Sequence, residues 1–426
     1  MGSLVVPIFL VLFATQLALE TALLLVNLRH VARASGAPPV LAGRIDDSTA
    51  ERSRAYTLAN GRFGLVEGLT GAAFTLVALF SGVLPWLDRA LAGRGLAGPH
   101  LFVAYLAVLS LASSVAGLPF RLYRTFVVEA RFGFNRTRPR TWVADHLKAF
   151  GVQAALGLPL LYAVHAFVRF TGPFWWIWLF GFLALFQLFL LWLYPAVIAP
   201  LFNRFEPLPE GPLRRRLEAM AGDAGFRNRG LFVMDASRRS GHSNAYFAGV
   251  FRPRIVLFDT LVAQMSVDEA ASVLAHEIGH YRAHHVHRRL AVGLATTLSG
   301  LFVLSRLVPW APLHAAFGFA APTLHGAIAL LTLAGGPFVF WLRPVAACLS
   351  RKHEYEADRF AVRLARAPEA LKGALVRLNG ENLSNLHPHP WYSAWHYSHP
   401  PLVERLAGVD REAAAAGLTP SPAGTA

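Results

Sequence analysis

Seven long apolar runs constrain this sequence more than any other feature. They cover residues 4–27, 64–86, 100–120, 149–168, 174–200, 289–311 and 323–348. Each run is long enough to cross the hydrocarbon core of a bilayer as a helix, and the stretches between them are polar and bear arginine. Only 15% of the 426 residues are charged, whereas soluble domains have about a quarter. These features predict a mainly α-helical, polytopic membrane protein with seven transmembrane helices.

The basic residues between the runs predict an orientation. The segments after the first, third, fifth and seventh runs are basic, whereas those after the second, fourth and sixth carry few or no basic residues. Because basic loops are retained in the cytoplasm, the N-terminus is predicted outside, and the polar region after run five and the C-terminal region are predicted inside. This pattern accounts for the net charge of +15. No nucleic-acid-binding motif accompanies the charge, so we predict no nucleic-acid partner.

The stretch His276-Glu277-Ile278-Gly279-His280 lies in the polar region between the fifth and sixth runs. Two histidines four residues apart on a helix share one face, so both imidazoles can bind the same ion. Glu277 projects beside that ion, where it can take a proton from a bound water. Ser266 and Glu269 are spaced as a capping box, which predicts that a helix begins just before this stretch. The pattern indicates a zinc hydrolase with one Zn²⁺ per chain.

A catalytic zinc site needs a third protein ligand, which must come from another part of this chain. Just beyond the seventh run, a helical pattern carries Glu354, Glu356 and Asp358. We choose Glu354 as the third ligand, with Asp358 accepting the ring N–H of a ligand histidine. Spacing alone leaves the three carboxylates as alternatives to one another.

Three further histidines, His284, His285 and His287, closely follow the first motif. A site with three histidine ligands is therefore also compatible with the sequence. His284 lies four residues after His280, on the same predicted face. We expect it to lie near the ligands without binding the metal, or to be solvated.

Stretches spread over nearly the whole chain resemble the type I CaaX prenyl endopeptidase family. They are residues 132–137 (FGFNRT), 197–203 (VIAPLFN), 243–247 (SNAYF), 254–260 (RIVLFDT), 276–280 (HEIGH), 350–358 (SRKHEYEAD) and 397–406 (YSHPPLVERL). Members of this family are integral-membrane zinc proteases whose seven transmembrane helices enclose a chamber with the active site facing inward. If this chain does the same, Glu20 and Glu67, inside the first and second runs, face the water of that chamber. The first metal motif alone is shared by many proteases, but the combined order is highly specific.

The resemblance implies zinc bound by three residues, His276, His280 and Glu354. It also implies that Glu277 is the general base, and that His399 and Arg405 reach into the site from the C-terminal region. His399 is suited to donate a hydrogen bond to the oxyanion of a tetrahedral intermediate, and Arg405 is suited to hold Glu354 or Asp358.

Three segments have the composition of short strands: residues 231–236, 244–251 and 254–259. The last two are joined by a turn at Arg252-Pro253, so we predict a small β-hairpin or sheet in the protease region. A protease can hold an extended peptide by pairing it with the edge of such a sheet. On the family pattern, Asn244, Ala245 and Tyr246 form this substrate-binding edge, with Asn244 near the scissile carbonyl. The alternative is an ordinary core hairpin with Asn244 in its turn.

These interpretations divide the chain into five segments. Residues 1–202 hold transmembrane helices one to five, 203–288 the cytoplasmic protease domain with the first zinc motif, 289–348 helices six and seven, and 349–412 the cytoplasmic catalytic C-terminal region with the third ligand. Residues 413–426 are predicted to be a disordered tail. Cys348, the only cysteine, is predicted to be a small buried residue. The alanine- and arginine-rich, lysine-poor composition favours a bacterial cell inner membrane.

The sequence leaves the substrate open. The reaction is peptide hydrolysis, and the partners are peptide or protein substrates, prenylated or membrane-associated, together with the lipid bilayer. One alternative keeps the chemistry but makes the chain a quality-control protease that degrades unprenylated membrane polypeptides. Another is a non-enzymatic transporter or scaffold, because ionisable residues in apolar runs are typical of transporters. That second alternative would not need a complete zinc-hydrolase constellation.

Overall fold

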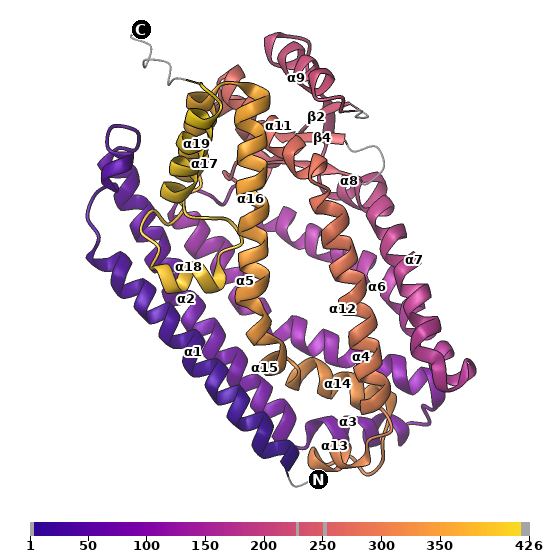
Figure 1. Ribbon diagram of the computed structural model, residues 1–426. Helices are drawn as coiled ribbons and strands as arrows, with labels where there is room; N and C mark the ends of the chain where they lie inside the picture. Colours follow the sequence, from indigo (N-terminus) through magenta and orange to yellow (C-terminus); the bar gives the residue numbers. More distant parts are fainter. Residues whose placement is uncertain (1–3, 227–229, 250–253, 419–426) are drawn as a thin grey trace.

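The computed structural model describes residues 4–226, 230–249 and 254–418 (Figure 1). This described part is mainly helical, as predicted, with one small sheet. The long helices occupy one half of the molecule, and the sheet lies near the other end with α9, α11 and α16 around it (Figure 1). The predicted turn at Arg252-Pro253 and the end of the predicted tail, residues 419–426, lie outside the described residues.

Within the described ranges, six helical segments are long and apolar enough to cross a membrane. They are α1 (Val5–Arg33), α2 (Asp47–Phe80), Gly98–Glu129, α6 (Pro139–Phe170), Gly172–Phe202 and α12 (His285–Leu307). Gly98–Glu129 joins α4 (Gly98–Ala116), α5 (Leu118–Tyr123) and the π-helix η3 (Arg124–Glu129), while Gly172–Phe202 contains α7 (Trp175–Leu193) and α8 (Ala199–Phe202). The described part has a seventh candidate crossing if α14 (Leu324–Ala334) and Gly336–Ala365, which are bent by 50° to each other, form one span. The predicted polytopic membrane architecture is thus confirmed.

Several helices extend beyond the apolar runs that predict them. α1 continues to Arg33, α2 begins at Asp47 and α6 begins at Pro139. Hydropathy reports the part of a helix that lies in hydrocarbon, whereas a polar stretch can continue the same helix in water. Asp46 marks the start of α2, because its side chain accepts a hydrogen bond from Thr49 N at 2.8 Å. This is an N-cap, and it stabilises the water-exposed end of the helix.

The membrane helices do not form a closely packed bundle. Between 0% and 17% of the residues in the apolar windows of the six crossings are buried, and α6 has no buried residue. In Figure 1, α1 and α2 stand on one side and α7 and α12 on the other, with α16 between them. Low burial is expected of membrane helices that face lipid on one side and a chamber on the other, and the chamber itself stays a prediction.

The two glutamates inside the apolar runs are ion-paired. Glu20 Oε1 lies 2.8 Å from Arg343 Nη1, and Glu67 Oε2 lies 2.5 Å from Arg124 Nη2. Such pairing offsets part of the cost of holding a carboxylate at membrane depth. Their exposure to chamber water stays a prediction.

The end of the molecule opposite the sheet is closed by α3 (Val83–Ala92) and α13 (Ala311–Ala316). These short helices pack with the ends of the long ones around a buried apolar cluster that includes Phe9, Leu84, Tyr105 and Phe317. A hydrogen bond of 2.8 Å joins His325 Nε2 in α14 to Asp88 in α3. This end is therefore held by both apolar packing and a polar contact.

The sheet has four strands in the order β1-β2-β4-β3, with β1 Phe205–Pro207, β2 Leu231–Met234, β3 Ala245–Ala248 and β4 Arg254–Phe258. β3 pairs with β4 antiparallel, as the predicted hairpin requires, β2 pairs with β4 in parallel, and β1 pairs with β2 antiparallel. The strand β1 was not predicted, because its three residues, Phe205 to Pro207, are too few to give a periodic pattern. β3 lies at an edge of the sheet.

The protease region has one core, built from distant parts of the chain. Its helices are α9 (Pro212–Asp223), α10 (Asp259–Gln264), α11 (Val267–Arg282), α16 (Arg343–Ala365), α17 (Pro368–Glu381), α18 (Pro390–His396) and α19 (Leu402–Ala415). Its buried residues come from both predicted protease segments, and also include Leu41, Ile45 and Ala50 from the N-terminal segment. The two predicted catalytic segments are therefore a single packing unit to which residues near position 45 also belong.

Two smaller predictions are wrong at the residue level. The tail does not begin at 413, because α19 continues to Ala415 and Ala413 packs in the core on the apolar face of that helix. Cys348 is exposed rather than buried. It lies on a side of α16 that is not covered by another described element, whereas its neighbour Ala347 is buried.

Candidate active site

Helix α11 carries the first motif in a buried position. The predicted capping box is present: Ser266 N donates to Glu269 Oε2 at 2.8 Å, and Glu269 N donates to Ser266 Oγ at 3.3 Å. These bonds satisfy backbone and side-chain groups at the start of the helix and fix where it begins. His276 is buried and His280 is half-buried, and both face α16, which runs beside α11.

α11 and α16 approach each other closely at Gly279. A β-carbon added there would lie 3.0 Å from Ala357 Cα and 3.1 Å from Ala357 O. The absence of a side chain at 279 and the small one at 357 therefore let the two backbones touch. This close approach brings Glu354, one turn before Ala357 on α16, against the two histidines.

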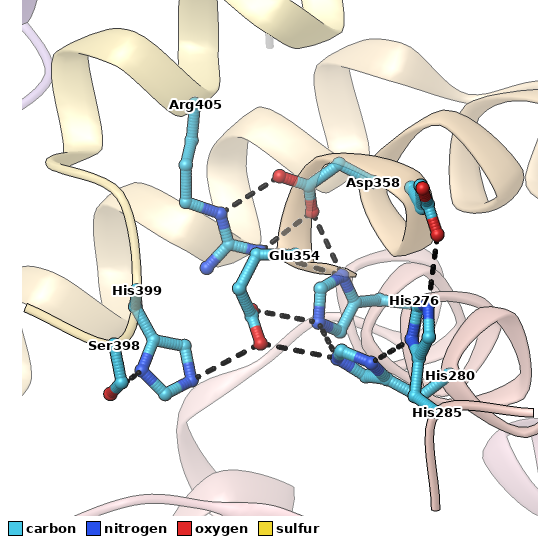
Figure 2. Close-up of polar contacts among 9 residues, drawn as sticks. His276, His280, His285, Glu354, Asp358, Ser398, His399 and Arg405 are labelled. Carbon is cyan, nitrogen blue, oxygen red and sulfur yellow. Dashed lines mark hydrogen bonds and ion pairs between the residues drawn. The ribbon is translucent and has the colours of Figure 1, made fainter. Parts of the chain in front are cut away.

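Three side chains converge on one point. His276 Nε2 and His280 Nε2 lie 3.1 Å apart, and the Glu354 oxygens lie 3.5 Å from His276 Nε2 and 3.3 Å from His280 Nε2. Figure 2 shows the two imidazoles and the carboxylate turned toward one another. Among the described residues, they form the only group of three His, Cys, Asp or Glu side chains close enough to hold one metal ion.

Asp358 fixes the ring of His276. The Nδ1 atom of His276 lies 2.8 Å from Asp358 Oδ1, and the N–H must be on the histidine because an ionised carboxylate only accepts. Arg405 donates to both Asp358 oxygens, at 2.8 Å from Nε and 2.6 Å from Nη2. The sequence suggested that Arg405 holds either Glu354 or Asp358. The structure shows that its partner is Asp358.

A second chain of contacts fixes the ring of His280. His285 Nε2 lies 3.0 Å from Glu356 Oε2, and His285 Nδ1 lies 2.9 Å from His280 Nδ1. Because Glu356 accepts, His285 carries its proton on Nε2 in the neutral form, and its Nδ1 then accepts from the N–H of His280. Both ligand histidines thus present an Nε2 lone pair to the same point.

The residues fit a metal ion. Two Nε2 lone pairs aimed at each other across 3.1 Å repel unless a cation or proton lies between them. Glu354 Oε2 is also buried and has no hydrogen-bond partner among the described residues, although a buried carboxylate oxygen normally has one. Burial alone would lower the pKa of His276, but its contacts with Asp358 and Glu354 raise it to about 9. A proton held in this way occupies the position that a metal ion would take on binding.

The sequence offered His285 and Glu356 only as alternative metal ligands and missed their role in orienting His280. The expectation for His284 assumed that the helix continues past His280, but α11 ends at Arg282, and His284 has φ of 55°. The chain therefore turns, and His285, rather than His284, lies against His280 and is buried. His284 is exposed. The break could not be placed from the sequence, because no glycine or proline marks it.

Replacing His285 by alanine is expected to lower metal affinity about 10- to 100-fold, the usual effect of losing a partner that orients a ligand. The matched control is His287→Ala, which removes an exposed histidine from the same segment. Metal titration of the purified variants measures the effect. Equal affinities for the two variants would show that His285 does not orient the ligand.

Glu277 follows His276 directly on α11, and His399 lies beside Glu354. Within the described ranges the side chain of Glu277 has no hydrogen bond, and burial raises the pKa of its carboxyl group. His399 Nε2 lies 3.5 Å from Glu354 Oε1, and its Nδ1 lies 3.1 Å from Ser398 Oγ. His399 enters from the loop before α19, and its side chain is exposed, as Figure 2 shows at the edge of the group.

The predicted substrate edge is an unpaired strand edge in the described structure. β3 pairs only with β4, and it contacts α11, the helix that carries His276. Ala245 packs toward the protease core, whereas the Tyr246 ring lies on the other side of the sheet with Phe258. Asn244 is exposed, and its Oδ1 accepts from Ala245 N at 2.8 Å. Because Asn244 O accepts from Phe258 N, the alternate residue Tyr246 also directs its backbone groups toward β4, and a peptide added at this edge would meet the backbone groups of Ala245.

Membrane-crossing helices that carry an HExxH helix against a helix with a third carboxylate define an integral-membrane metalloendopeptidase. Comparisons with known proteins agree. Residues 27–204 match the family model described as CAAX prenyl protease N-terminal, five membrane helices, and residues 207–413 match the model of peptidase family M48. The chain belongs to peptidase family M48, as the resemblance in its sequence indicated. It is a multi-pass integral membrane protein whose family implies a metal cofactor and peptide or protein substrates.

Similar proteins cover most of the chain. A "CAAX prenyl protease 1 homolog" of Oryza sativa subsp. japonica is 40% identical over 392 residues, which are 88% of this chain and 90% of that protein. The "CAAX prenyl protease 1" of Saccharomyces cerevisiae is 34% identical, with 88% of each chain covered. The crystal structure of S. mikatae Ste24p superposes with a TM-score of 0.87 at 31% identity, covering 94% of this chain and 98% of that one. These matches indicate a metalloendopeptidase and do not favour the non-enzymatic transporter or scaffold.

Proposed function

We propose that this chain is a zinc-dependent endopeptidase that cleaves prenylated CaaX proteins near their C-terminus. The observation that carries the proposal is the convergence of His276 Nε2, His280 Nε2 and the unpartnered oxygen of Glu354. Two nitrogens and one carboxylate, with a position left open for water or substrate, are the donors of a catalytic zinc site. The substrate class follows the names of the relatives.

In this proposal, His276, His280 and Glu354 hold one zinc ion per chain. When bound, zinc would polarise the scissile carbonyl and the attacking water. Asp358 and the His285–Glu356 pair keep the two imidazoles in the tautomer that leaves Nε2 free. Arg405 holds Asp358 in place and balances its charge in a buried setting.

Proton transfer is assigned to Glu277. A carboxylate with a raised pKa accepts a proton from water more readily, and it can then return the proton to the leaving amine. His399, exposed beside Glu354, would donate a hydrogen bond to the oxyanion. Its position on the open side of the ligand group leaves its Nε2 accessible to a substrate.

The substrate backbone would pair with β3. Backbone hydrogen bonds to Ala245, whose N–H and C=O face the open edge, would hold an extended peptide without depending on its sequence, with Tyr246 beside them in the same strand. Asn244, exposed at the start of the strand, would lie near the scissile carbonyl. Its side-chain NH2 group can donate to a peptide carbonyl while its Oδ1 still accepts from Ala245 N.

We also propose that the catalytic region faces the cytoplasm and that the five-segment division of the chain is functional, with both catalytic segments on one side. The support is the alternation of basic and non-basic segments along the sequence. The proposed location in a bacterial inner membrane rests on composition alone.

A farnesylated CaaX peptide is expected to be cleaved with a kcat/KM at least about tenfold above that of the same peptide with an unmodified cysteine, because burial of two methylene equivalents already contributes about 1.6 kcal/mol. Purified protein in detergent or nanodiscs and mass spectrometry of the products give both rates and cut sites. A scrambled farnesylated peptide controls for membrane partitioning. Equal cleavage of modified and unmodified peptides would favour the quality-control alternative.

A further inference from the structure

A groove between α2 and the α5–η3 segment lies outside the residues that build the active site. Its volume is about 790 Å³, which is within the range of pockets that hold small ligands. Leu58 and Val66 of α2 form one apolar wall, and Phe120 and Val127 of α5 and η3 form the other. The groove is thus shaped and lined for an apolar chain.

The rim of this groove carries an excess of positive charge. Arg54, Arg62 and Arg131 line it, with Glu51 as the only acidic residue. Arg54 already pairs with Glu51, at 2.6 and 2.9 Å. Within the described ranges, Arg62 and Arg131 have neither an ion pair nor a side-chain hydrogen bond, and Arg131 lies only over the Phe132 ring. Two arginines are therefore free to bind an anion.

The groove faces away from the protease core. An α-helix turns by about 100° per residue, so Arg62 and Ser53, nine residues apart, lie on opposite sides of α2. Ser53 is 1% exposed, and Ala50 near it belongs to the core that α11 and α17 share. The groove also lies where α2 changes from its arginine-bearing part to its apolar part. Lipid headgroups lie at this level of a transmembrane helix.

We propose that this groove binds an anionic glycerophospholipid of the surrounding bilayer. The phosphate lies on Arg62 and Arg131, where guanidinium groups can donate paired hydrogen bonds to its oxygens. One acyl chain lies along Leu58 and Phe120. The prenyl group of a substrate would match the apolar walls, but it would leave both arginines without a partner, and it would lie on the side of α2 opposite the catalytic core. This proposal does not depend on the proposed proteolytic substrate.

The test uses the full-length protein in detergent, titrated with phosphatidylglycerol or phosphatidylcholine and examined by native mass spectrometry. The double variant Arg62→Gln/Arg131→Gln is compared with Arg138→Gln/Arg140→Gln, which removes the same charge from exposed arginines that do not line the groove. We expect the first pair to weaken phosphatidylglycerol binding at least about tenfold, from the loss of two phosphate contacts. The second pair should bind as the wild type does, and the wild type should bind phosphatidylcholine, whose choline cation offsets the phosphate charge, more weakly than phosphatidylglycerol.

A third variant, Val66→Trp, fills the groove without changing the charge. Val66 is 56% exposed, so a larger side chain meets no core packing. Loss of phosphatidylglycerol binding in this variant would support the groove. Wild-type binding in both Val66→Trp and the Arg62/Arg131 variant would overturn the proposal and leave only diffuse electrostatic attraction. Displacement of the lipid by a farnesylated peptide in equimolar competition would also overturn it, in favour of a substrate site.

Discussion

Replacing Glu277 by glutamine is expected to lower kcat/KM by about 10³-fold or more, as removal of a general base does, while the metal remains bound. Glutamine has nearly the same shape but cannot accept a proton from water. The change leaves the three converging donors intact, because Glu277 has no hydrogen bond to any of them in the described structure. Peptide-cleavage rates and metal content per chain measure the two effects separately.

The matched control for this prediction is Glu218→Gln, an exposed glutamate on α9 that pairs with Arg214. It should leave both activity and metal content unchanged. Near-wild-type cleavage by Glu277→Gln would remove Glu277 from the mechanism. Loss of metal in this variant would instead make Glu277 a structural part of the site.

Replacing Glu354 by glutamine is expected to remove the metal from the purified protein and to eliminate cleavage. The carboxylate is 2% exposed, and it contributes the only negative charge among the three donors. Loss of a direct ligand should weaken binding by more than the 10- to 100-fold typical of an orienting partner, thus by more than about 100-fold. Metal per chain after dialysis against a weak chelator measures the change, with wild-type protein expected to retain about one zinc.

Glu369→Gln is the control for this variant, because Glu369 forms ion pairs with Arg44 and Lys372 away from the site. It should retain the metal. His399 is the competing candidate for the third ligand, because its Nε2 lies 3.5 Å from Glu354 Oε1. If Glu354→Gln kept the metal and His399→Ala lost it, the third ligand would be His399.

The first metal motif and the membrane helices could be predicted from the sequence because both depend on local patterns. Four-residue spacing places His276 and His280 on one face of any helix, and an apolar run of sufficient length predicts a crossing wherever it lies. The capping box at Ser266 and Glu269 fixed the helix start for the same reason. Each of these signals is read within fewer than about 25 residues.

The third ligand could not be chosen from spacing. Glu354, Glu356 and Asp358 lie within five residues of one helix, and all three have a partner near the metal position in the folded chain. Which carboxylate faces the histidines depends on how α11 and α16 cross, and the crossing depends on the contact between Gly279 and Ala357. Before the structure was known, only the resemblance to the protease family singled out Glu354 among the three carboxylates.

The role of His285 was missed for a related reason. The i, i+4 rule holds only while the helix continues, and α11 ends two residues after His280. The positive φ of His284 then carries His285 back toward the ligand. A turn without glycine or proline leaves no local signal in the sequence.

The helix that carries Glu354 has a consequence for any attempt to cut out a soluble enzyme. α16 begins at Arg343, which pairs with Glu20 on the first membrane helix, and it runs without a break to Ala365. One continuous helix therefore joins the bilayer to the metal position. The catalytic core also includes Leu41 from before α2 and Ala50 from the first turn of α2. No single fragment free of membrane helices contains all the donors and the core that supports them, so the hydrolytic centre and its membrane anchor are inseparable by truncation.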